Sequence, residues 1–491
     1  MKPILAPFLV AAALSGCTLM PHYERPPAPV PNSWPSDTHV HENANRTADQ
    51  IGWRDFFTDP RLVRLIEIAL ENNRNLRIAV LNVSASQAQF RVQRSVLFPS
   101  ISATGSEYVE RFPTNGAFPL GGLGGSGGST LVPTGATSST FRYFNAGIGF
   151  TSYELDLFGR ERSLTTEAFE QYLSQYESRR STQISLVGEV AADYFAVLAD
   201  RALLRLTHET LRNETESYDL AKAMYDRDTT TLLALRQAES AVDAARASLS
   251  QYERQLALDT HALVLVLGEE IPEDLPTGQN IEREGLLEAL PAGLPSDLLT
   301  RRPDIVSAEH ALRASNADIG AARAAFLPSI QLTGSGGTAS TRLASLFGKG
   351  SGTWTFAPTI SLPIFTGGEN RANLDLAHIE KNIAVARYEL TIQTAFREVS
   401  DALSARGTYV DELKAQGALV AADADAYRLA ELRFRAGVDS YLNTLDAQRS
   451  LYAAQQSLVT LRQAELANQV TLYKALGGGW MQHSGGGGHP Q

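Results

Sequence analysis

The sequence predicts a mainly α-helical chain in which very long coiled-coil helices are combined with four β-strands, arranged as two copies of one unit. Three observations support this fold class. Short strings recur at a nearly constant separation, two stretches of nearly seventy residues contain no proline, and apolar residues alternate with small or polar ones before the second stretch. These patterns indicate a tandem duplication, long helical rods and strands, respectively.

The first seventeen residues have the pattern of a secretory signal peptide. Met1-Lys2 precedes an apolar stretch from Ile4 to Leu14, which is too short to span a bilayer and remain there. The following Ser15-Gly16-Cys17 resembles the bacterial lipobox, in which the cysteine carries the acyl (palmitate) chains. We expect residues 1–16 to be removed, Cys17 to be lipidated, and proline-rich residues 17–50 to form an extended leash. The alternative is an ordinary cleaved signal with a chance cysteine.

Matching strings divide the rest of the chain into two repeats. Phe98-Pro99-Ser100-Ile101 recurs as Leu327-Pro328-Ser329-Ile330, and Leu267-Gly268 recurs 209 residues later as Leu476-Gly477. Several matches at similar separations indicate duplication rather than chance. The boundaries that follow are residues 51–268 for repeat 1, 269–296 for an inter-repeat linker, 297–478 for repeat 2 and 479–491 for a glycine-rich tail.

Repeat 1 is longer because a loop interrupts it between two strands. The loop contains the run Gly121–Gly128, which is typical of an exposed flexible segment. The run also fits the pattern Gly-x-Gly-x-x-Gly, but no buried strand precedes it and no helix follows it. It therefore predicts no dinucleotide site, and we expect no cofactor.

Each repeat is predicted to contain a β-hairpin followed by long helices. The hairpins are expected at about 100–155 and 329–365, where apolar residues such as Trp354 and Phe356 alternate with small or polar ones. The proline-free rods span about 158–225 and 366–434. Apolar residues at intervals of seven within the helices indicate coiled-coil seams, formed by Val242, Leu249, Leu256 and Leu263 in repeat 1 and by Leu376, Ile383 and Leu390 in repeat 2.

Four strands per chain predict an oligomer. A sheet with open edges is not tolerated in lipid, so the four strands would have to join those of other chains to close a transmembrane barrel. No apolar run of about eighteen residues is present to form a spanning helix. The alternative is a four-stranded sheet between helices that is not in a membrane.

Composition excludes several function classes. The chain carries 43 Lys plus Arg against 54 Asp plus Glu, for a formal net charge of −11, and it has no dense basic run, so nucleic acid is not an expected partner. A single cysteine rules out an intramolecular disulfide and a zinc ribbon. The nine histidines do not show the His-Glu-x-x-His spacing, and no acid pair is joined to a His or nucleophile in a recognisable spacing. We therefore predict that the protein is not an enzyme.

Several long strings resemble the outer-membrane efflux protein family of TolC-like channels, and most closely its OprM-type lipoprotein members from RND multidrug efflux systems. The resemblance covers nearly the whole mature chain. The strings are Gly52-Trp53-Arg54-Asp55-Phe56-Phe57, Tyr153-Glu154-Leu155-Asp156-Leu157-Phe158-Gly159-Arg160, Arg301-Arg302-Pro303-Asp304-Ile305, Asn316-Ala317-Asp318-Ile319-Gly320-Ala321-Ala322-Arg323-Ala324-Ala325-Phe326 and Leu472-Tyr473-Lys474-Ala475-Leu476-Gly477-Gly478-Gly479-Trp480.

The resemblance implies a homotrimer in the outer membrane of a Gram-negative bacterium, anchored by lipid and extending into the periplasm. Three chains would form a twelve-stranded transmembrane β-barrel, continued by a long coiled-coil α-helical barrel with a small α/β equatorial belt. The implied function is the exit duct of a tripartite multidrug and antibiotic efflux pump. Its implied partners are outer-membrane lipid, a periplasmic adaptor (membrane fusion) protein and an inner-membrane RND transporter.

The family motif also implies a gate at the periplasmic helix tips. Leu442 and Asp446 match the positions of an apolar ring and an acidic ring at the constriction, and their spacing places both on one helix face. Gly437 is suited to the positive φ of a tight helix-ending turn. Three copies of Asp446 would repel one another and concentrate cations, so a weak hydrated-cation ring is plausible there, while no other metal site is predicted.

Other tip residues match the family only in part. Arg435 and Asp439 match the polar network that holds the tip closed. Phe434 stands where the family often has Tyr, so a hydrogen bond from that hydroxyl is absent. In the first-repeat tip, Asp228, which follows Tyr225, stands where the family usually has Gly, although Asp tolerates left-handed geometry better than most residues.

Two other functions remain compatible with the sequence. One is an outer-membrane duct for type I protein secretion, which shares the architecture. The other is a lipid-anchored coiled-coil tether with no pore. Drug susceptibility of a deletion strain separates efflux from secretion, whereas a tether predicts no conductance.

Overall fold

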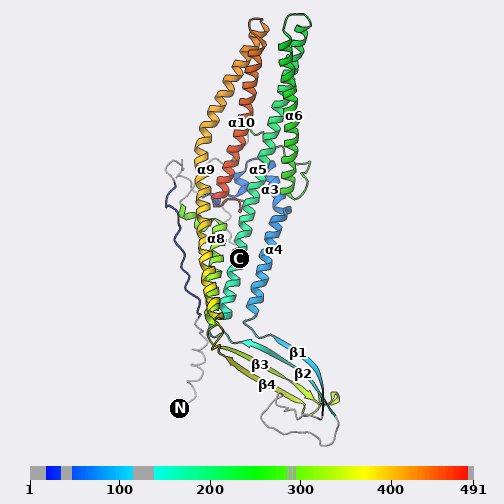
Figure 1. Cartoon of the computed structure of the whole chain (residues 1–491), viewed down its shortest axis with the longest axis vertical. Coiled ribbons are helices and arrows are strands. Elements are labelled where there is room, and N and C mark those ends of the chain that lie inside the picture. The colour runs from blue at the N-terminus through cyan, green and yellow to red at the C-terminus, as the bar shows by residue number, and fades with distance from the viewer. Residues whose placement is uncertain are drawn as a thin grey trace. The chain divides into compact units, whose positions relative to one another are not determined.

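A computed structural model of the chain describes residues 18–34, 47–113, 138–282, 285–286, 290 and 295–484. Cys17, the Gly121–Gly128 loop and residues 485–491 lie outside the described residues. Figure 1 shows the elements, which in chain order are η1 (Ala48–Gln50), α2 (Trp53–Phe56), α3 (Pro60–Asn72), α4 (Arg74–Ser95), β1 (Ile101–Pro113), β2 (Ser138–Glu154), α5 (Arg160–Tyr225), α6 (Leu232–Leu267), η2 (Pro295–Asp297), α7 (Leu298–Arg301), α8 (Pro303–Ala324), β3 (Ser329–Ser340), η3 (Leu343–Ser345), β4 (Gly352–Ser361), α9 (Glu369–Arg435) and α10 (Tyr441–Ala475).

The order of elements repeats, which confirms the internal duplication. The series α4, β1, β2, α5, α6 corresponds to α8, β3, β4, α9, α10. The helices α4 and α8 have 22 residues each, and α5 and α9 have 66 and 67 residues, close to the predicted rods. The positive φ angles of Gly268 (78°) and Gly477 (86°), after α6 and α10, show that the repeats also end alike.

The chain forms two compact units, and each contains parts of both repeats. One unit consists of Met1–Tyr23, Gln87–Glu170 and Arg313–Asn382 and contains the sheet. The other consists of Glu24–Ser86, Gln171–Leu312 and Ile383–Gln491 and contains most of the helical hairpins. Neither unit therefore corresponds to a single repeat.

The sheet has four antiparallel strands in the order β1-β2-β3-β4, which confirms the predicted strand number. The two hairpins are joined by pairing of β2 with β3, in a register that shifts between Phe150 and Tyr153. Gly147 and Gly337 lie opposite each other, and a Cβ at Gly337 would lie 2.3 Å from the carbonyl oxygen of Ala146. Strands β1 and β4 pair on one side only within the described residues, so the sheet has two free edges.

Aromatic residues of the Gly-Trp-Arg-Asp-Phe-Phe string form the core of the second unit's belt. Trp53, Phe56 and Phe57 are buried. The ring of Phe56 stacks on Tyr473 of α10 at a centroid distance of 4.0 Å, and the Tyr473 hydroxyl donates a hydrogen bond to the Ile51 carbonyl (2.6 Å). These contacts hold the start of the helical region against the C-terminal end of α10.

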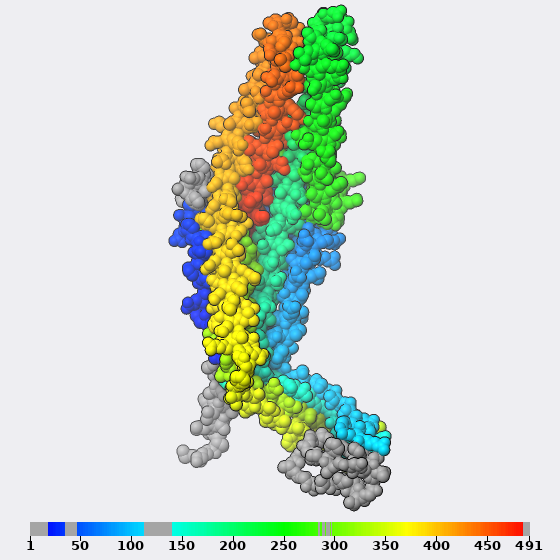
Figure 2. Space-filling model, viewed as in Figure 1, coloured from blue at the N-terminus to red at the C-terminus, as the bar shows by residue number. Residues whose placement is uncertain are grey.

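Within the second unit, the α5–α6 hairpin lies beside the α9–α10 hairpin (Figures 1 and 2). The α6 seam is packed within the chain, as burial of Ala238 and Val242 shows. The α9 seam is not, because Leu376, Ile383 and Leu390 are 46–61% exposed. No helix in the described part of the chain is both long and apolar enough to cross a membrane. The predicted α9 seam is thus left as an apolar stripe on a single chain.

The first described residues, Thr18–Tyr23, lie along helix α8 in the sheet-containing unit. They form no helix or strand, and side chains of α8 bind their backbone carbonyls. Arg323 Nη1 donates a hydrogen bond to the carbonyl of Leu19 (3.3 Å), and Asn316 Nδ2 donates one to that of Pro21 (2.9 Å). This part of the predicted leash is therefore held on the helix.

Two glycines allow this segment to approach closely. A Cβ at Gly159 would lie 3.0 Å from the Cα of Thr18, and a Cβ at Gly320 would lie 2.8 Å from the Cα of Met20. The Gly320 distance is too short for a Cβ unless neighbouring atoms shift, and a Cβ at Gly159 would be tight and would also be strained by the positive φ of 76°. The lack of side chains at these two glycines therefore lets residues 18–20 lie close to the backbone.

Candidate functional site at the helix-hairpin tips

The predicted gate residues lie at the ends of the two helical hairpins. We call residues 225–232, between α5 and α6, the first tip, and residues 434–441, between α9 and α10, the second tip. Figure 2 shows these ends, green and orange, next to each other. The tips are 209 residues apart, the same separation as the glycines that end the repeats.

The first tip contains a left-handed turn at Asp228. Its φ is 57°, and its amide donates a hydrogen bond to the carbonyl of Tyr225 (2.9 Å). The amide of Thr229 donates to the carbonyl of Met224 (2.9 Å). This pair of bonds is the Schellman motif, which satisfies carbonyls that the helix end would leave free.

The second tip has the same backbone turn with a different residue at its centre. Gly437 has a φ of 72° and donates to the carbonyl of Phe434 (2.9 Å), and Val438 donates to that of Arg433 (3.0 Å). Glycine has little preference between positive and negative φ, whereas a residue with a Cβ is strained there. The geometry is therefore shared and only the second tip adopts it without strain.

Asp439 organises the polar side of the second tip. Its carboxylate accepts hydrogen bonds from the amide of Ser440 (2.9 Å), from Arg433 Nε (3.1 Å) and from Asn443 Nδ2 (2.6 Å). These contacts, the Ser440 amide first, lower the pKa of Asp439. The carboxylate stays charged and links the end of α9 to the start of α10.

Arg435 lies in the same tip but pairs with a different acid. Its Nη2 donates to Glu431 Oε1 at 2.7 Å, one turn back along α9. The structure of a single chain therefore places Arg435 and Asp439 in one tip without joining them. The Arg435 side chain is exposed, whereas that of Asp439 is partly buried by its contacts within the tip.

Leu442 and Asp446 occupy the exposed face of α10, directly after the second tip. Leu442 is 52% exposed, and Asp446 is exposed one turn further on. On the opposite face, Leu445 and Thr444 are buried, and the Thr444 hydroxyl donates to the carbonyl of Ala430 in α9 (3.3 Å). The apolar and acidic side chains thus form one surface, as their spacing predicts.

A small core beneath the tips packs the two hairpins together. Its buried members come from α5, α6 and α10, and Tyr218, Leu235 and Phe434 pack around them. The Phe434 ring lies 5.5 Å from that of Tyr441, so Phe434 acts here as an apolar contact. Tyr225, at the end of α5, is 37% exposed. The buried members are Ala221, Ala238, Ala241, Tyr441 and Leu445.

Glu214 of α5 is a buried carboxylate just below this core, and the sequence analysis missed it. It is 4% exposed, and its Oε2 has no hydrogen-bond partner among the described residues. Burial raises the pKa of Glu214 to about 7, although Arg449 of α10 opposes the shift. Burial and the nearby Glu214 also raise the pKa of Tyr441 to about 12. No local sequence signal marks Glu214, because its surroundings come from residues more than 200 positions away.

A pocket of about 230 Å³ opens beside the tip core. It lies between α5, α9 and α10 and combines aromatic with acidic and hydroxyl side chains. Residues of the predicted gate, Phe434 and Arg435, contribute to its wall. The other principal lining residues are Glu216, Ser217, Tyr427 and Tyr441.

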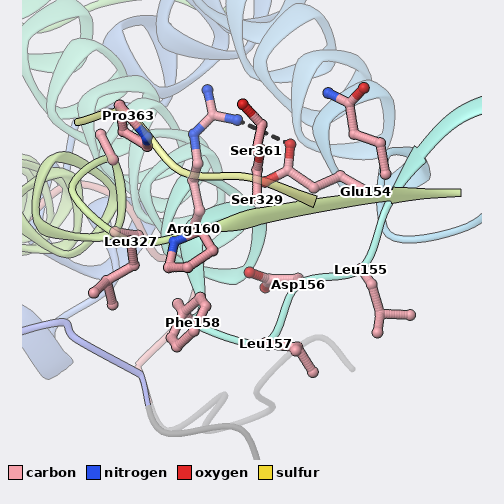
Figure 3. Close-up of a pocket in the computed structure, with 14 residues that line it drawn as sticks. Glu154, Leu155, Asp156, Leu157, Phe158, Arg160, Leu327, Ser329, Ser361 and Pro363 are labelled. Carbon is pink, nitrogen blue, oxygen red and sulfur yellow. Dashed lines mark hydrogen bonds and ion pairs between the residues drawn. The ribbon is translucent and has the colours of Figure 1, made fainter. Parts of the chain in front are cut away.

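A separate pocket of about 320 Å³ lies at one end of the sheet, and Figure 3 shows its lining. Its acidic side chains are paired with arginines, since Arg160 donates to Glu154 at 3.2 Å and Arg162 donates to Asp156 at 3.0 Å. These pairs connect the end of β2 to the first turn of α5. Among the described residues, no group of three His, Cys, Asp or Glu side chains is placed to hold a metal ion.

In a comparison with known proteins, one family model matches both repeats. The family model described as outer membrane efflux protein matches residues 65–269 and 294–478. The chain is 49% identical over 486 residues to the probable efflux pump outer membrane protein TtgC of Pseudomonas putida, covering 99% of this chain and 97% of that protein. It is 42% identical over 476 residues to outer membrane protein OprJ of Pseudomonas aeruginosa, covering 96% and 95%.

The fold is also similar to solved channel structures. The open state of the Neisseria gonorrhoeae MtrE outer membrane channel superimposes with a TM-score of 0.84 at 37% sequence identity. The alignment covers 95% of this chain and all of that one.

Proposed function

Because the chain belongs to the outer membrane efflux protein family, we propose that it is the outer-membrane exit duct of an efflux pump, passing drugs and other small solutes out of the cell. The observation that carries this proposal is the match of both repeats to the family, with 49% identity to an efflux-pump outer membrane protein over nearly the whole chain. The family consists of channels, so the protein is not an enzyme.

The pump would have three parts. A duct in the outer membrane has no energy source of its own, so transport must be driven from the inner membrane. The partners are an inner-membrane transporter of the RND type and a periplasmic adaptor that joins it to the duct. The hairpin tips, which carry an aromatic and acidic pocket at their surface, are the part of this chain that would meet the adaptor.

Three features support a homotrimer as the working form. The four-stranded sheet has free edges at β1 and β4, and the α9 stripe of Leu376, Ile383 and Leu390 is uncovered in a single chain. A solved structure with a similar fold, that of Neisseria gonorrhoeae MtrE, is an outer membrane channel. Three copies would join their strands into a twelve-stranded barrel and cover the α9 stripes, which removes both the unpaired edges and the exposed apolar surface. A lipid on Cys17 would anchor the assembly in the outer membrane.

The second tip would form the periplasmic gate. Leu442 and Asp446 share an exposed face of α10, so three copies would present an apolar ring and an acidic ring to the axis. The acidic ring would attract hydrated cations. Arg435 and Asp439 would hold the tips closed, with Phe434, Tyr225 and Asp228 shaping the turns around them.

Deletion of the gene tests the function. The deletion strain should become more sensitive to a panel of antibiotics and organic solvents, and the gene supplied in trans should restore resistance. Loss of secretion of a protein toxin with unchanged drug sensitivity would favour type I secretion instead. The purified protein should conduct ions in planar lipid bilayers, whereas a tether without a pore would not.

Single-channel conductance tests the gate. Asp446→Ala and Arg435→Ala should each raise conductance several-fold. Asp446→Ala removes the acidic ring from the constriction, and Arg435→Ala removes a charged group that would hold the tips closed. Asp425→Ala is the matched control, since Asp425 is an exposed acid on α9 before the tip and pairs only locally with Arg428 (3.1 Å). Wild-type conductance in both tip variants would remove this gate assignment.

A further inference from the structure

We propose that an arginine-lined pocket in the belt of the second unit binds a dianion, either a phosphate group or a pair of neighbouring carboxylates. The pocket has a volume of about 320 Å³ and lies between the start of α3, the middle of α5 and residues 275–281. Arg61 of α3 and Arg201 and Arg205 of α5 contribute to its wall. It is separate from the tips and from the pocket at the end of the sheet.

Two of the three guanidinium groups are not neutralised by an ion pair in the described part of the chain. Arg61 and Arg201 each lack a carboxylate within salt-bridge distance there, and they repel each other. Arg205 donates to Asn280 Oδ1 (3.2 Å) and lies 3.8 Å from Glu282. Partial burial and the charge of Arg61 lower the pKa of Arg201. The pocket therefore carries excess positive charge, which a bound anion would offset.

The acid closest in the chain to Arg61 is already fully engaged. Asp59 is buried, and its Oδ2 accepts hydrogen bonds from the Tyr194 hydroxyl (2.6 Å) and the Gln279 amide (3.1 Å). Its Oδ1 accepts from the amide of Arg61 (2.8 Å) and caps α3. Asp59 thus joins α3, α5 and the 275–281 segment around the pocket, so the three walls are fixed relative to one another before a ligand arrives.

Gly278 permits the close approach of these walls. A Cβ at this position would lie 2.5 Å from the Tyr194 hydroxyl oxygen and 2.8 Å from Arg61 Cδ. Any side chain here would displace either the Tyr194–Asp59 hydrogen bond or the arginine. The glycine therefore keeps Arg61 against the 275–281 segment and directed along the pocket wall.

The arrangement of charges indicates the chemical class of the ligand. Arg201 and Arg205 are one helical turn apart, on the face of α5 that also carries Tyr194 and Leu198. A guanidinium group matches the oxygens of a carboxylate or phosphate with two parallel hydrogen bonds. Two or three such groups in one pocket suit a doubly charged anion, and the volume leaves room for a small body attached to it.

Thermal unfolding of the full-length, detergent-solubilised protein tests the proposal. Inorganic phosphate and succinate would each be compared with sodium chloride at the same ionic strength, so that the screening of charges by salt is equal in all samples. Binding to the folded state raises the unfolding midpoint, and a concentration of about ten times Kd should raise it by about 1 °C. Arg201→Gln and Arg61→Gln should each lose most of this increase.

Arg212→Gln is the matched control, because Arg212 is an exposed arginine of α5 that does not line the pocket. It should keep the wild-type response. Isothermal titration calorimetry on the same proteins should show at least tenfold weaker binding for both pocket variants. A response to phosphate alone assigns a phosphate ligand, and a response to succinate alone assigns a carboxylate ligand. No response to either anion, or an equal response in all four proteins, would overturn the proposal.

Discussion

The two tips share one backbone turn but differ in almost every side chain that surrounds it. Both have a left-handed residue at the same step and the same pair of closing hydrogen bonds. The first tip is completed by threonine, since Thr231 caps α6 by accepting from the Ala234 amide (3.2 Å). The second is completed by charge, because Asp439 accepts from Arg433 and from two neighbours.

This difference separates the backbone hydrogen bonds that form the turn from the side chains that would form the gate. The duplication preserved the hydrogen bonds that turn the chain between two helices. The apolar position is also preserved, since Leu233, the equivalent of Leu442, is 68% exposed. The acidic position is not, because the residue equivalent to Asp446 in the first repeat is Gln237. The two hairpin ends therefore differ in charge rather than in exposed apolar surface.

The largest expected effect concerns Glu214, which lies where the first hairpin packs on the second. Its pKa is raised from 4.5 to about 7, so the folded protein binds a proton that the unfolded chain releases. Stability should therefore fall as pH rises from about 4.5 to about 7, by at most about 3 kcal/mol at 1.36 kcal/mol per pKa unit. Glu214→Gln should remove this loss and raise the unfolding midpoint at pH 8, with little change at pH 4.

Glu216→Gln is the control for this experiment, since Glu216 is exposed only two residues away. It should keep the wild-type pH dependence. Asp193 and Asp200, whose pKa values burial raises to about 6 and about 7, act in the same direction, so some dependence will remain in Glu214→Gln. An unchanged difference between pH 5 and pH 8 in that variant would show that Glu214 does not couple the hairpins to pH.

The next effect comes from exchanging the residues at the left-handed step. Gly437→Ala should destabilise the second tip by about 1 kcal/mol, because a Cβ there meets no atom within 4 Å and the cost is that of the backbone alone. Asp228→Gly should stabilise the first tip by about 0.5 kcal/mol, since relief of strain exceeds the added freedom of the unfolded chain. Chemical denaturation measures both, and effects of the same sign would show that the two turns are not equivalent.

The smallest effect is expected at Asp439, whose side chain is partly exposed. Its pKa is lowered below 3.8, so its contribution to stability is present above that pH and is lost as pH falls through the lowered value. Asp439→Asn should lower the unfolding midpoint slightly at pH 7, and this decrease should become smaller as the pH falls below 3.8. Thr230→Asn, at the equivalent position of the first tip, should leave the midpoint unchanged at both pH values.

Much of the fold could be predicted because its signals are local. The absence of proline located α5 and α9, and alternation located β3 and β4. Gly437 could be assigned a positive φ from its place at the end of a helix. The pairing of β2 with β3 could not be inferred, because it joins strands from different repeats and no local pattern records which strands become neighbours.

The candidate site was predicted only in part for the same reason. The residues of the second tip lie within one short stretch, so the family motif could locate them. Glu214 depends on α10, and the Arg61, Arg201 and Arg205 pocket depends on Asp59 binding residues 135 and 220 positions away. These side chains are brought together by tertiary packing, and the sequence around each of them has the pattern of an ordinary helix surface.

The close approach of residues 18–20 to Gly159 and Gly320 has a consequence for the geometry of anchoring. Thr18 is the residue next to Cys17, and it is held against Gly159 at the start of α5, close in the chain to the end of β2. Thr18 therefore enters the described part of the chain at this strand–helix junction. An anchor attached just before Thr18, such as the proposed lipid, would then act on this junction, and lengthening the proline-rich segment after it would not move the point of attachment.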